Sequence, residues 1–185
     1  MSVQEFDRPG RFNEFKVEPM TSLKTSGTFD CGISEYNDYL YTDALRSRND
    51  HVAFTWLLTE RPTGKTAAYM SLIMDAIKLS GAEKELHNLQ YPFRTIPAMK
   101  IAKLAVDSSF SKKYKGIGTF MIDYAERFAW ACNLTYCAAR FLTVDADIEH
   151  DKGVLAFYEK NGFIPNAEFY NKNRKTISMR KDLYQ

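Results

Sequence analysis

One segment, in which a strand leads through a basic loop into a helix, limits the possible folds of this chain more than any other feature. It is Lys100–Thr119, with the sequence KIAKLAVDSSFSKKYKGIGT. Its apolar residues predict a buried strand over Met99–Val106, and apolar residues at helical spacing predict a helix over Ile117–Ala131, directly after Gly116. Because such a helix needs a sheet on which to pack, the segment indicates a fold that mixes α and β structure.

Strands and helices alternate along the rest of the chain. The residue pattern predicts strands at Phe12–Met20, His51–Thr59, Ala67–Leu79, Ala139–Val144, Phe163–Phe169 and Thr176–Leu183. It predicts further helices from a cap at Ser34 to about Asn49, and over Val154–Lys160, where Asn161-Gly162 ends the helix. Loops are expected at Thr21–Gly32 and Arg61–Lys65, and an irregular insertion at Gly81–Ile96. With neither a repeat nor a linker in the sequence, we expect a single domain over residues 1–185, a mixed α/β sheet with helices on its faces.

Composition excludes several classes of protein. The chain has 185 residues, of which 45% are hydrophobic, and it lacks an apolar run of the roughly 20 residues that would span a bilayer. It also lacks a secretory signal, so we expect a soluble cytoplasmic protein without a membrane partner. The net charge of +2 is too small to indicate nucleic-acid binding by the whole surface. The cysteines, expected to be reduced thiols, are Cys31, Cys132 and Cys137.

The loop before Ile117 has the chemistry of an anion site. Glycines at 116 and 118 allow the backbone to approach a ligand closely, and the first N–H groups of a helix have no partner within it. Positive charge is added by Lys112, Lys113 and Lys115. Since glycines before a helix are also common in tight turns, the pattern alone leaves both interpretations open.

Two blocks of the sequence resemble the GNAT family of N-acetyltransferases. Leu104-Ala105-Val106-Asp107 followed by Lys113-Tyr114-Lys115-Gly116-Ile117-Gly118 is similar to the coenzyme A motif of that family, with Lys113 at a position that is Gln or Arg there. The resemblance implies a mixed, mostly antiparallel central sheet flanked by helices, with acetyl-CoA as co-substrate. The backbone of the strand would pair with the pantetheine arm. The residues that the resemblance assigns to the cofactor are Leu104, Ala105, Val106, Lys112, Lys113, Tyr114, Lys115, Gly116, Ile117, Gly118, Thr119 and Asp151.

The second block, Asp151–Phe163, has the sequence DKGVLAFYEKNGF and resembles the family's Asn-x-x-Ala-x-x-Phe-Tyr-x-x-x-Gly-Phe. Tyr158 falls on the tyrosine of that pattern, which implies a general acid that protonates the leaving thiolate of coenzyme A. Asp151 stands where the family has Asn, and Val154 where it has Ala. Without the resemblance, a tyrosine on a short helix is more often a packing residue.

The sequence does not identify a general base. Asp107, Glu149, His150 and Asp151 are candidates, although Asp107 is also a natural loop cap and Asp145–Asp151 also fits a solvated acidic turn. That turn lacks the glycine and glutamate of a calcium loop, and we expect no metal. A water chain, or no base, is the alternative. An α-amine has a pKa of about 7.7–8.0 and needs less help to lose its proton than a lysine at about 10.4.

A further resemblance concerns the acceptor. Phe29-Asp30-Cys31-Gly32, followed by Asn37 and Leu40, looks like the start of a GNAT branch related to bacterial toxins that acetylate aminoacyl-tRNA. It implies charged tRNA as acceptor, an antitoxin protein as partner and a homodimer. A basic cluster suits a phosphate backbone or a solvated strand equally: Lys172, Arg174, Lys175, Arg180 and Lys181. The alternatives are acetylation of a small amine, peptide or protein, and a non-catalytic module that binds acyl-CoA.

Overall fold

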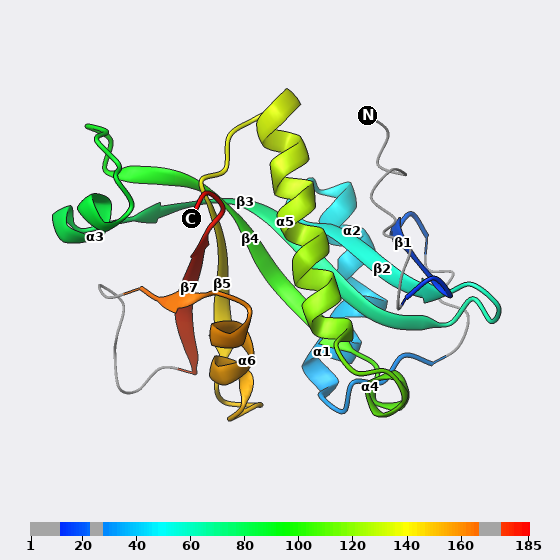
Figure 1. Ribbon diagram of the computed structural model, residues 1–185. Coiled ribbons are helices and arrows are strands. Elements are labelled where there is room, and N and C mark those ends of the chain that lie inside the picture. Colours follow the sequence, from blue (N-terminus) through cyan, green and yellow to red (C-terminus); the bar gives the residue numbers. More distant parts are fainter. Residues whose placement is uncertain (1–11, 23–27, 167–174) are drawn as a thin grey trace. The chain divides into compact units, whose positions relative to one another are not determined.

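The computed structural model describes residues 12–22, 28–166 and 175–185 (Figure 1). The described helices are α1 Ser34–Asp38, α2 Ala44–Asn49, α3 Gly81–Leu86, α4 Ser108–Lys113, α5 Ile117–Thr135 and α6 Val154–Lys160, and a π-helical segment, η2, spans Tyr39–Asp43 between α1 and α2. The strands are β1 Phe15–Pro19, β2 Phe54–Glu60, β3 Thr66–Lys78, β4 Thr95–Val106, β5 Phe141–Asp147, β6 Ile164–Pro165 and β7 Thr176–Asp182. Cys31, Cys132 and Cys137 are free, as predicted.

The strands form a mixed sheet in the order β1-β2-β3-β4-β5-β7-β6. β4 and β5 are parallel, and β1–β2, β2–β3, β5–β7 and β6–β7 are antiparallel pairs. The mixed, mostly antiparallel sheet expected from the sequence is therefore confirmed.

Two compact units divide the chain. The first comprises Met1–Ile73 and Ala102–Arg127, and the second comprises Met74–Ile101 and Phe128–Gln185. The long strands β3 and β4 and the helix α5 each contribute residues to both units. The single domain expected from the sequence stays a prediction.

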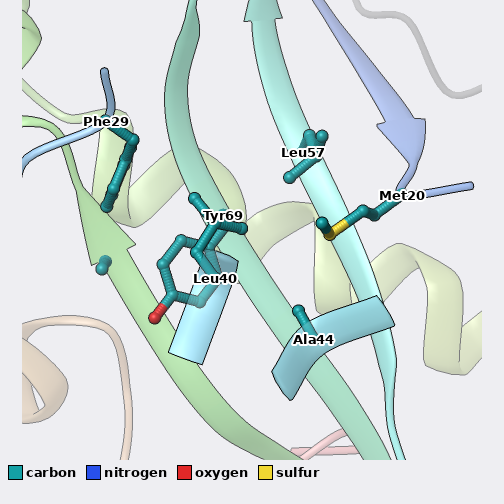
Figure 2. Close-up of a cluster of buried hydrophobic side chains, with 7 residues drawn as sticks. Met20, Phe29, Leu40, Ala44, Leu57 and Tyr69 are labelled. Carbon is teal, nitrogen blue, oxygen red and sulfur yellow. The ribbon is translucent and has the colours of Figure 1, made fainter. Parts of the chain in front are cut away.

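Helices cover both faces of the strands in the first unit, with the stretch α1-η2-α2 on one face and α5 on the other (Figures 1 and 2). Leu40 and Ala44, four residues apart on the helical stretch, are fully buried at 0% exposure. Together with residues of the strands and of the preceding loop they form a buried cluster, shown in Figure 2: Met20, Phe29, Leu40, Ala44, Leu57, Tyr69 and Ala105. The sequence placed a cap at Ser34, but Ser34 is the first residue of α1 and Ile33 occupies the cap position without a side-chain hydrogen bond.

The second unit contains a helix where the sequence predicted only an irregular insertion. α3 begins after Ser80, whose hydroxyl accepts a hydrogen bond from Glu83 N–H while the Glu83 carboxylate accepts one from Ser80 N–H. This reciprocal capping box satisfies donors that a helix start otherwise leaves free. The predicted helix over Val154–Lys160 is confirmed as α6, and Gly162 follows it at φ +85°, the left-handed conformation expected there.

Ionisable side chains gather in the second unit around the buried Arg180, in what we call the buried ion cluster: Glu83, His87, Arg140, Arg180 and Asp182, of which Arg140 is half-buried. Arg180, only 2% exposed, lies 2.8 Å from Glu83 and donates from Nε to His87 Nε2 at 3.3 Å. His87 Nδ1 lies 2.7 Å from the Asp182 carboxylate, which also accepts a hydrogen bond from Arg140 at 2.8 Å. Since Arg180 Nε donates to His87 Nε2, the proton of this imidazole is on Nδ1.

The burial of Arg180 corrects the interpretation of the basic cluster around β7. Arg180 is enclosed by its partners and is not available to a phosphate backbone. Lys175 is exposed but pairs with Glu149 at 2.9 Å, and Lys172 and Arg174 lie outside the described residues. The cluster read from the sequence is therefore not a single solvent-facing basic surface.

Candidate active site

The segment between β4 and α5, residues 107–116, which we call the β4–α5 loop, begins at a buried aspartate. Asp107 is 5% exposed and caps α4, since its carboxylate accepts hydrogen bonds from Ser109 N–H at 2.9 Å and from Phe110 N–H. The other carboxylate oxygen accepts from Asp30 N–H at 2.9 Å. The expected role of Asp107 as a loop cap is confirmed, and the helix α4 within the loop was not predicted.

Aromatic packing fixes the middle of this loop. The Tyr114 ring meets the Phe15 ring edge to face at a centroid distance of 5.0 Å and stacks on Phe110 at 6.2 Å. The Tyr114 N–H also donates to the Phe110 carbonyl at 2.7 Å. Tyr114 thus anchors the loop to β1, which holds the backbone of the next residues in place.

Gly116 provides the open backbone that an anion site requires. It has φ +91°, and a Cβ built on it would meet no atom within 4 Å. The positive φ explains why glycine is needed here, and the position where a side chain would stand is open space. Ile117, 2% exposed, fixes the start of α5 beside it, followed by half-buried Gly118 and Thr119.

The three lysines of the loop are exposed. Lys113 lies 3.7 Å from Glu60 and 4.6 Å from the centroid of the Tyr114 ring, and its hydrogen bond with Tyr114 raises the pKa of the ammonium. Neither Lys112 nor Lys115 forms an ion pair with any other described residue. The loop therefore combines accessible cations with open backbone donors, which suits a pyrophosphate.

The strand β4 leads directly into this loop. Its parallel register with β5 covers Ala98–Ile101, and the strand continues to Val106 beyond that register. Ala105 is buried in the cluster of Figure 2, whereas Leu104 and Val106 are half-buried. The predicted cofactor strand Leu104–Val106 and the loop residues Lys112–Thr119 lie in the same unit.

Tyr158 and Asp151 belong to the second unit. Tyr158 is 6% exposed on α6, and its ring packs edge to face against Phe157 at 5.1 Å and Phe163 at 5.3 Å. Burial raises the pKa of Tyr158 above its ordinary value, so the phenol stays protonated throughout the physiological range. Among the described residues, the Tyr158 hydroxyl has no hydrogen-bond partner.

The remaining candidates for a general base are engaged in local structure. Asp151 accepts a hydrogen bond from Gly153 N–H at 2.7 Å, in the turn that leads into α6. Glu149 pairs with Lys175, and His150 Nδ1 lies 2.8 Å from the Asp147 carboxylate. The described residues contain no group of three His, Cys, Asp or Glu side chains placed to hold a metal ion. Their helices include none long and apolar enough to cross a membrane.

Comparison with known proteins identifies the fold. No family model and no curated protein matches the sequence. Among solved structures, AtaTR bound with acetyl-CoA matches with a TM-score of 0.69 and 21% identity, over 90% of this chain and 94% of that one. AtaT complexed with acetyl-methionyl-tRNAfMet matches with a TM-score of 0.70 and 20% identity, over 89% and 93%. A mutant of KacT matches with a TM-score of 0.71 and 19% identity, over 90% and 95%.

The chain has the fold of these toxin structures, and the GNAT fold expected from the two sequence blocks is confirmed. The match extends over nearly the whole length of each neighbour. At these identities the comparison establishes the fold alone.

Proposed function

We propose that this chain is an N-acetyltransferase that moves an acetyl group from acetyl-CoA to a primary amine. The observation that carries the proposal is Gly116, an open left-handed residue directly before α5, in a loop with exposed Lys112 and Lys115. Backbone N–H groups of Gly116, Ile117 and Gly118 would bind the pyrophosphate of coenzyme A, and the Leu104–Val106 backbone would pair with its pantetheine arm. Structures of AtaT hold acetyl-CoA on the same fold.

In this proposal, Tyr158 is the general acid. The amine nitrogen attacks the thioester carbonyl, the carbon–sulfur bond breaks, and the thiolate receives the phenol proton. The attacking nitrogen loses a proton to water, and the phenolate regains a proton from water. The thiol has a pKa of about 8.5, and burial keeps Tyr158 protonated but makes it a weaker acid. Its position, more than its acidity, must therefore provide the rate enhancement.

The acceptor that fits best is an amine with a low pKa, and we infer the α-amine of an aminoacyl-tRNA. Each candidate base named from the sequence is occupied by local structure: Asp107, Glu149, His150 and Asp151. An α-amine with a pKa of about 7.7–8.0 is partly neutral at physiological pH, whereas a lysine at about 10.4 requires a base. The AtaT complex with acetyl-methionyl-tRNAfMet supports the same acceptor class.

Incubation with radiolabelled acetyl-CoA tests the acceptor. Charged tRNA and a panel of amines, peptides and proteins would be compared, and we expect label in the charged tRNA, lost on mild deacylation. Label in the amines alone would replace the tRNA acceptor with a small-molecule one. Tight acetyl-CoA binding without any labelled product would instead indicate a non-catalytic acyl-CoA-binding module.

The partners implied by the fold follow from the same proposal. AtaT has been solved with the C-terminus of the antitoxin AtaR, and KacTA with DNA. We infer an antitoxin-like protein partner, a homodimer and a cytoplasmic location for this chain, which forms one functional domain over residues 1–185. Co-purification with the product of an adjacent gene and light scattering of the purified chain test these points.

A further inference from the structure

In the first unit, Lys103 is a further cation, outside the β4–α5 loop and next to the candidate cofactor strand. It precedes Leu104–Val106 directly, and because side chains alternate along a strand, it shares a face with Ala105 rather than with Leu104. Ala105 belongs to the buried cluster of Figure 2, against which Tyr36 and Tyr39 pack. Lys103 is therefore on the sheet face that α1, η2 and α2 cover.

The neighbours of the Lys103 ammonium are aromatic rings. Its Nζ lies 4.5 Å from the centroid of the Tyr36 ring and 5.8 Å from that of Tyr39. It is half-buried, and within the part of the chain that the structure describes it forms no ion pair. Lys100, three residues earlier on the same strand, pairs with Asp145 at 2.5 Å. A half-buried ammonium that lacks a carboxylate keeps its N–H donors for another anion.

The tyrosines form a rigid platform under this ammonium. The Tyr39 ring stacks on Tyr69 at a centroid distance of 6.0 Å and an interplanar angle of 23°, and the Tyr69 hydroxyl donates to the Tyr36 carbonyl at 2.8 Å. Tyr39 also begins the π-helical segment, in which Ala44 N–H donates to the Tyr39 carbonyl five residues earlier. Such segments are rare and are frequently found at functional sites. These contacts position Tyr36 and Tyr39 relative to Tyr69.

A phosphate group is the anion that fits this arrangement. The proposed site for the cofactor pyrophosphate is the β4–α5 loop, with its own lysines, so Lys103 is left for a different partner. The tyrosine rings position the ammonium by cation–π contact, and a nucleic-acid backbone offers phosphate oxygens that accept hydrogen bonds from such a cation. We propose that Lys103, held over Tyr36 and Tyr39, binds a backbone phosphate of the acceptor tRNA. This inference rests on the proposed function for the identity of the acceptor.

Binding of fluorescently labelled deacylated tRNA over a range of salt concentrations tests the inference without turnover. The variants are Lys103→Met, Lys103→Arg and, as a matched control on the same strand, Lys100→Met. Loss of one phosphate contact lowers the slope of log K against log salt by about 0.7–0.9, and we expect this reduction with roughly tenfold weaker binding in Lys103→Met. Lys103→Arg should retain the slope, since it keeps the charge, and Lys100→Met should remain close to the wild-type chain.

Acetyl-CoA affinity and the thermal midpoint show that each variant is folded. If Lys103→Met and Lys100→Met bind tRNA with the same affinity and salt slope, or if the wild-type chain does not bind tRNA, the inference is wrong. Acetyl transfer is measured separately. If Lys103→Met transfers acetyl to tRNA with an unchanged KM, only this inference is wrong. If the wild-type chain transfers no acetyl group but Lys103→Met still has the reduced salt slope, the proposed activity is wrong and the phosphate contact stands.

Discussion

The β4–α5 loop and the buried ion cluster both gather cations, but they hold them in opposite ways. Lys112 and Lys115 of the loop are exposed and form no ion pair with other described residues. Arg180 of the cluster is 2% exposed and is enclosed by Glu83 and His87. Cations left accessible beside an open backbone indicate ligand binding, whereas cations closed in by their own counter-charges indicate structure. The two regions therefore predict different consequences of mutation.

The largest effect is expected from Gly116→Asp in the loop. Its φ of +91° disfavours any side chain, and the added carboxylate repels a pyrophosphate. We expect acetyl-CoA affinity in titration calorimetry to fall by at least about 10³-fold, the cost of roughly 4 kcal/mol. Gly81→Asp is the matched control, because its Cβ also meets no atom within 4 Å. Equal affinity in both variants would remove the cofactor site from this loop.

In the buried ion cluster, Arg180→Met should reduce stability rather than cofactor binding. It leaves Glu83, 9% exposed, without its cation, and breaking a buried pair in this way typically costs about 3–5 kcal/mol. Urea denaturation would show this as a lower midpoint. A variant that keeps the midpoint but loses acetyl-CoA affinity would assign Arg180 to the cofactor site instead.

Tyr158→Phe distinguishes a catalytic role of Tyr158 from a packing role. The ring and its contacts with Phe157 and Phe163 remain, and only the phenol proton is lost. We expect kcat to fall by about 10²-fold with acetyl-CoA affinity little changed, as for a general acid. Tyr136→Phe, at a side chain that is 83% exposed, is the control. Unchanged kcat in Tyr158→Phe would mean that Tyr158 is a packing residue only.

The buried ion cluster also predicts a dependence of stability on acid. Burial acts to raise the pKa of Asp182, but hydrogen bonds from Arg140, the Tyr184 N–H and His87 outweigh it and lower the pKa. The carboxylate therefore stabilises the fold above its unfolded pKa of about 3.9, and this contribution is lost as pH falls through the lower folded value. Denaturation midpoints at pH 7 and pH 3 should differ less in Asp182→Asn than in the wild-type chain. An equal difference would show that Asp182 does not contribute to acid sensitivity.

The smallest effect is expected where a cation is exposed but paired. Lys175 lies 2.9 Å from Glu149, with side chains that are 77% and 43% exposed. Because water screens such a pair, Lys175→Met should change the free energy of unfolding by only about 0–1 kcal/mol. Urea denaturation beside Arg180→Met gives the direct comparison of the two environments. A cost similar to that of Arg180→Met would show that exposure is a poor guide to the role of these cations.

Local patterns in the sequence predicted the candidate site better than they predicted its surroundings. The start of α5 at Ile117 and the bounds of α6, Val154–Lys160, follow from helical spacing and from the adjacent glycines. Ser80 and Glu83 have the spacing of a capping box, so the sequence did contain a signal for α3.

What the sequence could not indicate depends on partners in distant segments. The sequence predicted a surface cation at Arg180 because its counter-charge, Glu83, lies far away in the sequence. The apolar strand around Lys103 did not predict its contacts, because Tyr36 and Tyr39 belong to another element. The residues next to Arg180 and Lys103 in the sequence therefore predict neither the ion pair nor the aromatic contacts.

The π-helical segment has a consequence for how this protein can diverge. Its wider turn fits one more residue between Tyr39 and Ala44 than an α-helical hydrogen bond would span. The extra residue is taken up within this wide turn, so the helical residues before and after it keep their facing, and removing one residue there restores ordinary helical bonding. Leu40 within this segment and Ala44 after it both reach the buried cluster. A one-residue insertion or deletion elsewhere in the helical stretch would turn one of them away from that cluster by about 100°, whereas a change in length at this joint leaves the core packed.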